Sequence, residues 1–307
     1  MRIITTMRDD RLEVAGHRLE CVGRWPRVAR LSDEVWQEPP RPEISDLIAA
    51  ARGSRLRADL VTVAQDITAP EPRHAAFPLT WDSVAVADAT DFGSWWEALP
   101  QESRKHVRRS RKAGVVVRPA PFDHDLVAGI KRLYDETPVR QGRRFPHHGK
   151  ELATVRRENS SYLARSHFLG AYLGETLIGF VKLVRVGPAA RIMQILAAQA
   201  HRDVFPTQAL LAAAVELCPK LPVRHLIYGQ YIYGRKDRSP MTEFKRRNGF
   251  RDIRVPRYHV PLNWRGRLAL STGFHRPSGD RLPEPIVNVF LRLRSLALAV
   301  RPPRPAV

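Results

Sequence analysis

The stretch RSHFLGAYLGETLIGFVKL, residues 165–183, contains strand-like sequence on both sides of a short turn. Apolar and aromatic residues dominate the segments 167–173 and 176–186, and the Gly-Glu pair at 174–175 suits a tight hairpin between them. A further turn leads into a third strand-like segment at 191–198. Three such segments joined by short turns predict an antiparallel meander.

Helical and strand-like segments flank this meander on both sides. In chain order we expect a strand at 115–118, helices at 123–136 and 151–159, the meander, a helix at 208–218, a strand at 225–228, a helix at 241–248 and a strand at 254–262. The run ALLAAAVEL lies in the helix expected at 208–218 and has the composition of a buried helix. The resulting order is β-α-α-β-β-β-α-β-α-β, in which a meander leads into a β-α-β unit.

The residues before this region divide into two parts. Residues 1–88 are predicted to be β-rich, with strands at 18–28 and 60–63, a short helix at 44–52 and proline-rich stretches between them. Two helices then follow, at 92–99 and 103–113, and Gly114 suits the end of the second one. We find no chemistry in the first part.

The chain of 307 residues is strongly basic, with 51 Lys and Arg against 31 Asp and Glu and a formal net charge of +20. Such a field attracts polyanions, including nucleic acids, phosphorylated cofactors and anionic lipid headgroups. A coding bias toward Arg and Ala is the alternative explanation. The cations are densest in the helix at 103–113, which either coats a solvated face or contacts phosphates.

Cys21 and Cys218 are too far apart in sequence to suggest a metal or redox motif, so a reducing cytoplasm fits. The N-terminal residues lack the apolar core of a signal peptide, and no run of about 18 apolar residues exists to span a membrane. Residues 286–300, IVNVFLRLRSLALAV, predict an amphipathic helix that either docks on the protein or lies on the inner face of the membrane.

Three local motifs and the order of elements resemble the GNAT-related acyltransferases, in their Fem-like branch. The motifs are GETLIG at 174–179, TEFKRRNGF at 242–250 and WWEALPQESRKHVRRSRKAGV at 95–115. The resemblance implies an α/β (α+β) GNAT-like mixed sheet with flanking helices over residues 89–262. Residues 1–88 are then a β-rich accessory segment or a degenerate first GNAT half, and residues 263–307 are a basic extension.

The resemblance also implies where an acyl donor binds. In GNAT enzymes the backbone at the end of the fourth strand pairs with the pantetheine arm, and a glycine-rich loop cradles the pyrophosphate at a helix N-terminus. In this chain Phe205 and Thr207 replace the two glycines of that loop, and Pro206 removes an N–H donor. The residues expected to bind the donor are Leu196, Ala197, Ala198, Gln199, Arg202, Thr207 and Gln208. Acetyl-CoA or another acyl-CoA is the expected donor, and aminoacyl-tRNA, which Fem enzymes use, is the alternative.

Acyl transfer requires a polarised carbonyl, a neutral amine and a protonated leaving group. Tyr231 and Tyr233 lie where many GNAT enzymes place the general acid, and Lys245 of the TEFKRRNGF motif is a candidate for holding the oxyanion. His201 is the candidate base, because imidazole titrates in the useful range. Each of these side chains could instead be an ordinary core or surface residue.

A loop rich in Arg and His at 139–150 lies where GNAT enzymes shape the acceptor pocket. Its cationic residues predict an anionic acceptor, and they are Arg143, Arg144, His148 and Lys150. Adjacent histidines at 147–148 point apart and have no third ligand spaced for them, so no metal site is expected.

The sequence therefore predicts an acyl-CoA-dependent N-acyltransferase that acts on an amine or hydroxyl of a small-molecule, cell-wall or lipid-linked acceptor. A Fem-like transferase that uses aminoacyl-tRNA is the second hypothesis, with tRNA as a partner. The third is a non-catalytic GNAT-fold module that binds polyanions. The altered donor loop favours the second and third hypotheses, whereas the tyrosine cluster and the intact element order favour an enzyme.

Overall fold

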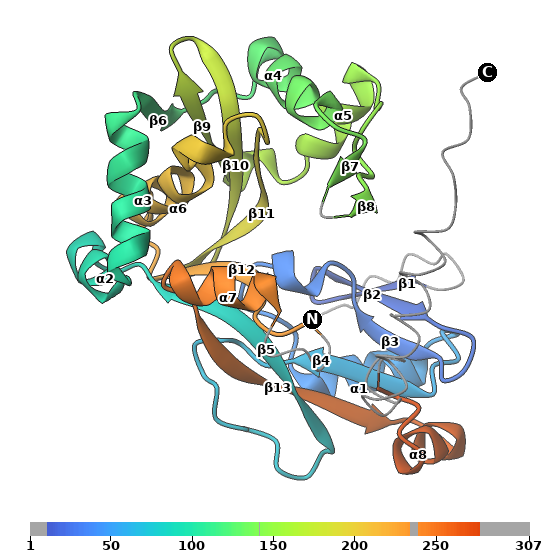
Figure 1. Ribbon diagram of the computed structural model, residues 1–307. Helices are drawn as coiled ribbons and strands as arrows, with labels where there is room; N and C mark the ends of the chain where they lie inside the picture. Colours follow the sequence, from blue (N-terminus) through green and yellow to red (C-terminus); the bar gives the residue numbers. More distant parts are fainter. Residues whose placement is uncertain (1–10, 141, 234–238, 277–307) are drawn as a thin grey trace.

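The computed structural model describes residues 11–140, 142–233 and 239–276 (Figure 1). Within them the helices and strands expected between residues 115 and 262 occur in the expected order. They are β6 (Val115–Pro119), α4 (His124–Asp135), α5 (Leu152–Asn159), β9 (Ser166–Leu173), β10 (Thr176–Val186), β11 (Ala189–Ala197), α6 (Pro206–Leu217), β12 (His225–Gln230), α7 (Pro240–Arg247) and β13 (Arg251–Pro261). A small hairpin, β7 (Val139–Arg140) and β8 (Arg143–Arg144), lies between α4 and α5.

The N-terminal part contains more strands than the sequence predicted. Its elements are β1 (Arg11–Val14), β2 (His17–Val22), β3 (Val28–Leu31), α1 (Ile44–Gly53), β4 (Leu60–Ala64) and β5 (Leu79–Asp88). The single strand expected over 18–28 is wrong, because Gly23 adopts a φ of +88° and the chain turns there between two antiparallel strands. The helices α2 (Phe92–Ala98) and α3 (Gln101–Lys112) follow as predicted.

One sheet of eleven strands contains both parts of the chain, in the order β1-β2-β3-β4-β13-β5-β12-β11-β10-β9-β6. The last strand, β13, lies between β4 and β5 and pairs antiparallel with each of them. Strand β5 in turn pairs with β12. The predicted boundary at residue 88 thus lies between two segments whose strands are neighbours in one sheet. The division of the chain into units at residues 88 and 262 stays a prediction.

The two parts share a local topology. In the N-terminal part, the meander β1-β2-β3 is followed by α1 and then by β4, which runs parallel to β3. In the second part, β9-β10-β11 is followed by α6 and then by β12, which runs parallel to β11. The N-terminal part therefore repeats the meander, helix and parallel strand of the second part.

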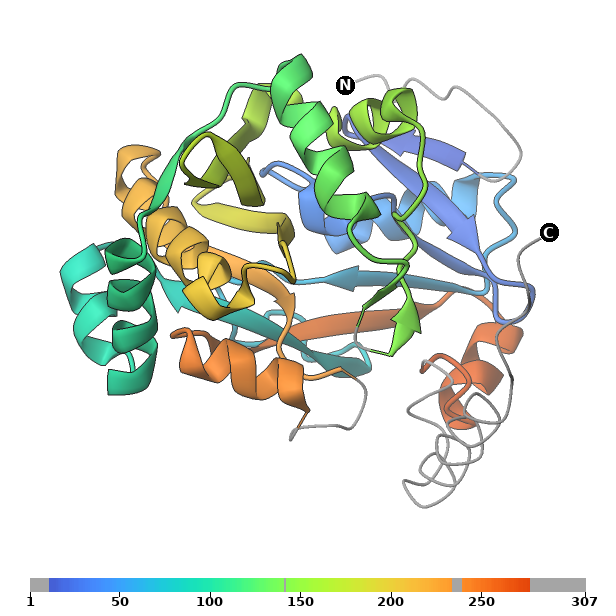
Figure 2. The ribbon, with the colours of Figure 1, turned by 45° about the horizontal axis from the view of Figure 1, so that its top comes forward.

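Helices cover both faces of this sheet in its second part (Figures 1 and 2). Val181 of β10 packs into a core with α2, α3 and α6, whereas the adjacent Phe180 packs into a separate core with α4 and α5. Successive residues of a strand point to opposite faces, so these two helical layers lie on opposite sides of the sheet. In the first part, α1 covers one face, with Val61 and Tyr258 in its core.

The helix α8 (Trp264–Ser271) packs on β13 at the end of the described chain. Gly266 makes this packing close, because a Cβ atom at this position would lie 2.0 Å from the carbonyl oxygen of Asp59. The contact secures the C-terminal end of β13 against the start of β4. None of the helices in the described ranges is long and apolar enough to cross a membrane.

We predict that Gly266→Ala lowers the free energy of unfolding by about 1–3 kcal/mol, because the added methyl group overlaps a backbone carbonyl that cannot move without disturbing β4. Urea denaturation followed by circular dichroism measures the change. Gly53→Ala is the matched control, since a Cβ atom at Gly53 meets nothing within 4 Å. Equal unfolding midpoints for the two variants would contradict the proposed packing.

Candidate active site

Strands β11 and β12 separate soon after they meet. They pair in parallel only from Ala189 to Arg191, opposite His225 to Ile227. Beyond this point β11 continues along β10 and β12 continues along β5, so the two strands diverge. Their facing edges no longer pair with each other, which makes this divergence a natural place to look for a site.

Lys245 of α7 is buried at the end of β12, with none of its surface exposed. Its ammonium group donates hydrogen bonds to the backbone carbonyl of Gln230 and to the hydroxyl of Tyr233, the latter at 3.2 Å. The rings of Tyr228 and Tyr233 each lie with their centroids 4.7 Å from Nζ. No carboxylate among the described residues forms an ion pair with Lys245, and burial lowers its pKa to about 8.

A second buried lysine, Lys182 of β10, provides a comparison. Its ammonium group donates to the carbonyls of Asn159 and Ser161 at 2.8 and 2.6 Å and to the Ser161 hydroxyl at 3.1 Å. Three acceptors match the three donors of an ammonium group, so Lys182 is satisfied and ties the end of α5 to the sheet. Lys245 has two such acceptors within the described chain, and the rings of Tyr228 and Tyr233 lie against its ammonium group as well.

The tyrosines predicted as general acids occupy different environments. Tyr233 reaches Lys245 with its hydroxyl and remains 47% exposed, and burial of the rest of its ring raises the pKa of that hydroxyl. Tyr231 packs against the core beneath α2, α3 and α6, and its backbone N–H donates to the carbonyl of Ser83 at 3.0 Å. Only Tyr233 of the two therefore contacts the lysine.

The end of β11, predicted to bind the donor, already has partners in the protein. The Ala197 carbonyl accepts a hydrogen bond from the guanidinium of Arg140 at 2.9 Å. The Glu136 carboxylate accepts from the backbone N–H groups of Gln199 and Ala200, each at 2.8 Å. Arg140 and Glu136 also pair with each other at 2.8 Å. These two side chains therefore bind backbone groups of the segment predicted to hold the donor.

The predicted pyrophosphate loop is also covered. Phe205 adopts a φ of +54° before α6, and its ring stacks on His106 of α3 with the centroids 4.0 Å apart. Arg109 also contacts the Phe205 ring, with its guanidinium carbon 5.0 Å from the ring centroid. Arg202 is exposed, and Thr207 and Gln208 are half-buried in the first turn of α6. An aromatic side chain thus lies where a glycine loop would admit phosphate.

The remaining predicted residues do not converge on Lys245 through any contact in the structure. Arg143 and Arg144 form the exposed strand β8, and His148 is also exposed. Lys150 is neutralised by Glu158, whose two carboxylate oxygens lie 2.7 and 2.6 Å from its ammonium group. His201 is half-buried before the 3₁₀ turn at Arg202–Val204. The catalytic and acceptor roles of these residues stay predictions.

A cavity of about 1250 Å³ lies over the N-terminal part of the sheet. Its floor includes Thr62, Asp82 and Arg257, from three neighbouring strands, and the register places these side chains on the face opposite α1. Gln230 and Ile232 also line it, and Gln230 is the residue whose carbonyl binds Lys245. The cavity therefore extends to the segment that holds the buried lysine.

Asp82 and Glu34 share a single cation at the base of this cavity. Arg257 donates to Asp82 at 2.8 Å and to Glu34 at 2.7 Å. Sequence reasoning missed all three residues. The alternation in β5 was the available signal, because Asp82 falls on the same side of the strand as Val84 and Val86, where an apolar residue would be expected.

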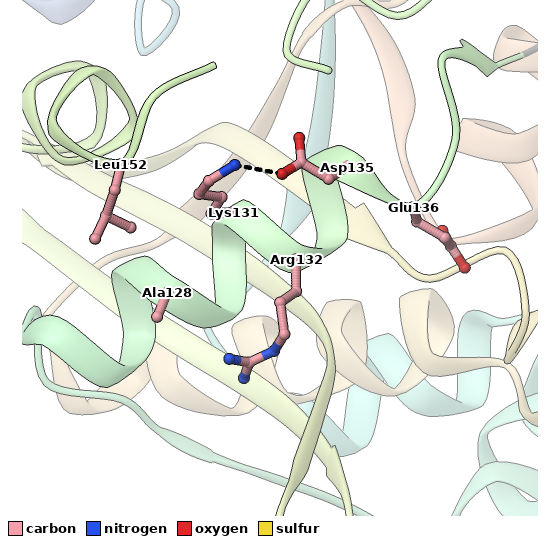
Figure 3. A pocket seen from close by; sticks show the side chains of 6 residues that line it. All are labelled: Ala128, Lys131, Arg132, Asp135, Glu136 and Leu152. Carbon is pink, nitrogen blue, oxygen red and sulfur yellow. Dashed lines mark hydrogen bonds and ion pairs between the residues drawn. The ribbon is translucent and has the colours of Figure 1, made fainter. Parts of the chain in front are cut away.

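A smaller and more open depression, of about 470 Å³, lies on α4 (Figure 3). Lys131 and Asp135 pair across it, whereas the carboxylate of Glu136 turns away from Lys131. That carboxylate binds the backbone after β11, as described above. Since its main polar groups bind each other, we do not place the active site there.

Comparison with solved structures agrees with this topology. FemX superposes with a TM-score of 0.58 over 87% of this chain and 89% of its own, at 10% sequence identity. The C-terminal domain of a putative lysylphosphatidylglycerol synthetase from Agrobacterium fabrum gives 0.53 over 89% and 90%, at 13% identity. L-PGS from Bacillus licheniformis gives 0.51 over 81% and 84%, at 12% identity. The chain has a Fem-like GNAT fold.

At these identities the likeness shows the fold, and the sequence itself matches no family model and no curated protein. The predicted resemblance to the GNAT superfamily and the predicted fold class are confirmed. Counted from β6 in the large sheet, β11 and β12 are the fourth and fifth strands of the second part of this fold, and Lys245 lies at the end of β12.

The buried lysines have a consequence for stability. Their pKa is about 8 in the folded protein against 10.5 for an ordinary lysine, so between these values the unfolded chain binds more protons. The free energy of unfolding must then rise with pH through this window. We predict that Lys245→Met reduces this rise by about 1–3 kcal/mol, measured by urea denaturation at pH 7.5 and at pH 10. An unchanged rise would show that Lys245 titrates as an exposed lysine.

Proposed function

We propose that this protein is an acyltransferase in which Lys245 stabilises the oxyanion formed at the donor carbonyl. The observation that carries the proposal is a buried ammonium group at the end of β12 that has no carboxylate partner among the described residues and that contacts the partly exposed Tyr233. Burying a lysine without a carboxylate costs free energy, and a developing negative charge at the site offsets that cost in the transition state.

Tyr233 has the position of the proton donor. Its hydroxyl contacts Lys245 and its ring is partly exposed, so the proton can pass to a leaving oxygen or sulfur beside the lysine. The acceptor nitrogen forms a bond to the carbonyl carbon as the bond to the leaving group breaks. The leaving group takes the Tyr233 proton, the adjacent ammonium group stabilises the phenolate, and the proton that the attacking nitrogen loses restores the Tyr233 hydroxyl.

An aminoacyl-tRNA suits this site better than an acyl-CoA. Arg140 and Glu136 occupy the backbone groups for a pantetheine arm, and Phe205 covers the loop for its pyrophosphate. The basic helix α3 lies directly beside this loop, through the contacts of His106 and Arg109 with Phe205. Its exposed cations are Lys105, Arg108, Arg109, Arg111 and Lys112. A row of cations of this kind binds a phosphate backbone without requiring a glycine loop.

We predict that Lys245→Met lowers the turnover of aminoacyl transfer by roughly 10²–10³-fold, as expected for loss of an oxyanion donor. Tyr233→Phe should also lower turnover, with little effect on donor binding. Single-turnover transfer from aminoacylated tRNA to an amine measures both. Lys182→Met removes an equally buried lysine outside the site, and at a temperature where it is folded it should retain wild-type turnover. Full activity in Lys245→Met would show that this lysine is not the oxyanion donor, and absence of transfer by the wild type would favour a non-catalytic binding module.

Donor choice has its own test. Calorimetry should show an aminoacylated tRNA that binds with a steep dependence on salt, and acetyl-CoA that binds no tighter than about 1 mM. Charge reversal at Arg109 should weaken the binding of tRNA about tenfold or more. Arg267→Glu makes the same change of charge on α8, at the other end of the molecule, and should have a smaller effect (Figure 1). Micromolar affinity for acetyl-CoA would instead support the hypothesis that an acyl-CoA is the donor.

A further inference from the structure

The outward face of α8 has an exposed apolar ridge. Trp264 is 66% exposed and Leu268 is 43% exposed, and their spacing of four residues places them on the same side of the helix. The opposite side, with Gly266 and Ala269, is buried against the sheet. Trp264 is the most exposed of the large hydrophobic side chains in the described ranges. A ridge of this kind, rimmed by polar residues, indicates a surface that binds a partner.

Two aromatic residues extend this ridge beside the helix. The ring of Trp25, in the turn between β2 and β3, lies 5.1 Å from the ring of Phe274, and the two side chains are 36% and 42% exposed. The same turn leads to Arg27, whose carbonyl accepts a hydrogen bond from the backbone N–H of Asp59, and Gly266 packs on that residue. Segments far apart in the sequence thus form one surface. We call it the α8 surface, and its apolar residues are Trp25, Trp264, Leu268 and Phe274.

Cations flank the apolar ridge on both sides. Arg265 and Arg267 are exposed, and the helical rotation of about 100° per residue places one on each side of the ridge. Arg265 lies 3.7 Å from the buried carboxylate of Asp59, whereas Arg267 forms no ion pair with any described residue. Residues 264–276 contain three arginines and no aspartate or glutamate. An apolar centre with cationic margins matches the boundary between the headgroups and acyl chains of an anionic bilayer.

The charge of the α8 surface selects among its possible partners. A second copy of the chain would bring like charges together, which is unfavourable. A nucleic acid would bind the arginines but would leave the apolar ridge in water. Only a lipid surface satisfies both. Residues 286–300, which the sequence predicts to be basic and amphipathic, follow α8 closely, and residues 277–285 span at most about 30 Å. Two such elements at one end of the molecule bind a membrane more firmly than either alone.

We propose that the α8 surface docks this protein on an anionic membrane, with Trp264 and Leu268 inserted at the level of the headgroups and Arg265 and Arg267 at the lipid phosphates. This inference goes beyond the proposed acyl transfer and does not depend on it. The basic helix α3 lies at the other end of the molecule (Figures 1 and 2). The protein can therefore bind a membrane and a polyanion at the same time.

The first test is cosedimentation with vesicles of phosphatidylcholine, either alone or with about 30 mol % phosphatidic acid. The wild type should bind the anionic vesicles at least tenfold more tightly than the neutral ones. Trp264→Ser should weaken binding to the anionic vesicles about tenfold, because it removes the largest inserted side chain. Val116→Ser is the matched control, since Val116 is 58% exposed but lies on β6, away from α8 (Figure 1), and it should bind like the wild type.

Charge reversal separates the membrane contact from the binding of tRNA. Arg267→Glu should weaken binding to the anionic vesicles about fivefold or more, with a smaller effect on tRNA. Arg109→Glu, on α3, should show the reverse preference. Lys245→Met should bind the vesicles like the wild type, so failure of the proposed acyl transfer would leave this result intact.

Tryptophan fluorescence reports the insertion directly. Lipids brominated on their acyl chains should quench the fluorescence of the bound wild type, and Trp264→Phe should retain binding but lose most of this quenching. Three results would each overturn the proposal. They are absence of wild-type binding to the anionic vesicles, unchanged binding in a folded Trp264→Ser, and equal losses of vesicle binding in Arg267→Glu and Arg109→Glu. The second would place the contact elsewhere, and the third would attribute it to overall charge.

Discussion

The pairing of β13 between β4 and β5 is the constraint on which the rest of the structure depends. The strand is hydrogen-bonded along both edges, with β5 from Arg251 to Tyr258 and with β4 from Arg257 to Pro261. This pairing joins the two parts of the chain in one sheet and places Arg257 beside Asp82. Because α7 immediately precedes β13, the same pairing also fixes Lys245 at the end of β12. The cavity and the buried lysine are thus consequences of one strand insertion.

Two groups in this region remain only partly satisfied, and their charges are opposite. Lys245 is buried with aromatic rings and a carbonyl around it, and Asp82 shares its guanidinium with Glu34. Buried charges of this kind destabilise the folded state unless they are paired. The protein contains fully paired alternatives nearby, such as Lys182 with its three acceptors. The contrast supports the proposed role of Lys245 at the oxyanion.

The donor region shows how one backbone arrangement can serve different chemistry. The GNAT strand end is retained in β11, but Arg140 and Glu136 bind its carbonyl and the N–H groups that follow. Phe205 then replaces a glycine and stacks on α3, which brings a row of cations to the mouth of the loop. The covered loop and the basic helix α3 therefore lie side by side, which supports the proposal of a polyanionic donor.

Local sequence determined the order of elements from residue 92 to residue 262, because hydrophobic period and turn residues act over a few neighbours. It also selected Lys245 and Tyr233 as candidates, from a recognisable motif and a tyrosine cluster, and the structure brings these two side chains into contact. It could not place β13 between β4 and β5, since this pairing joins residues up to about 200 positions apart and leaves no mark in local spacing. The shared cation of Asp82 and Glu34, the closure of the β11 end by Arg140 and Glu136, and the open divergence of β11 and β12 all arise from such long-range contacts. Only the tertiary structure decides which charges find partners.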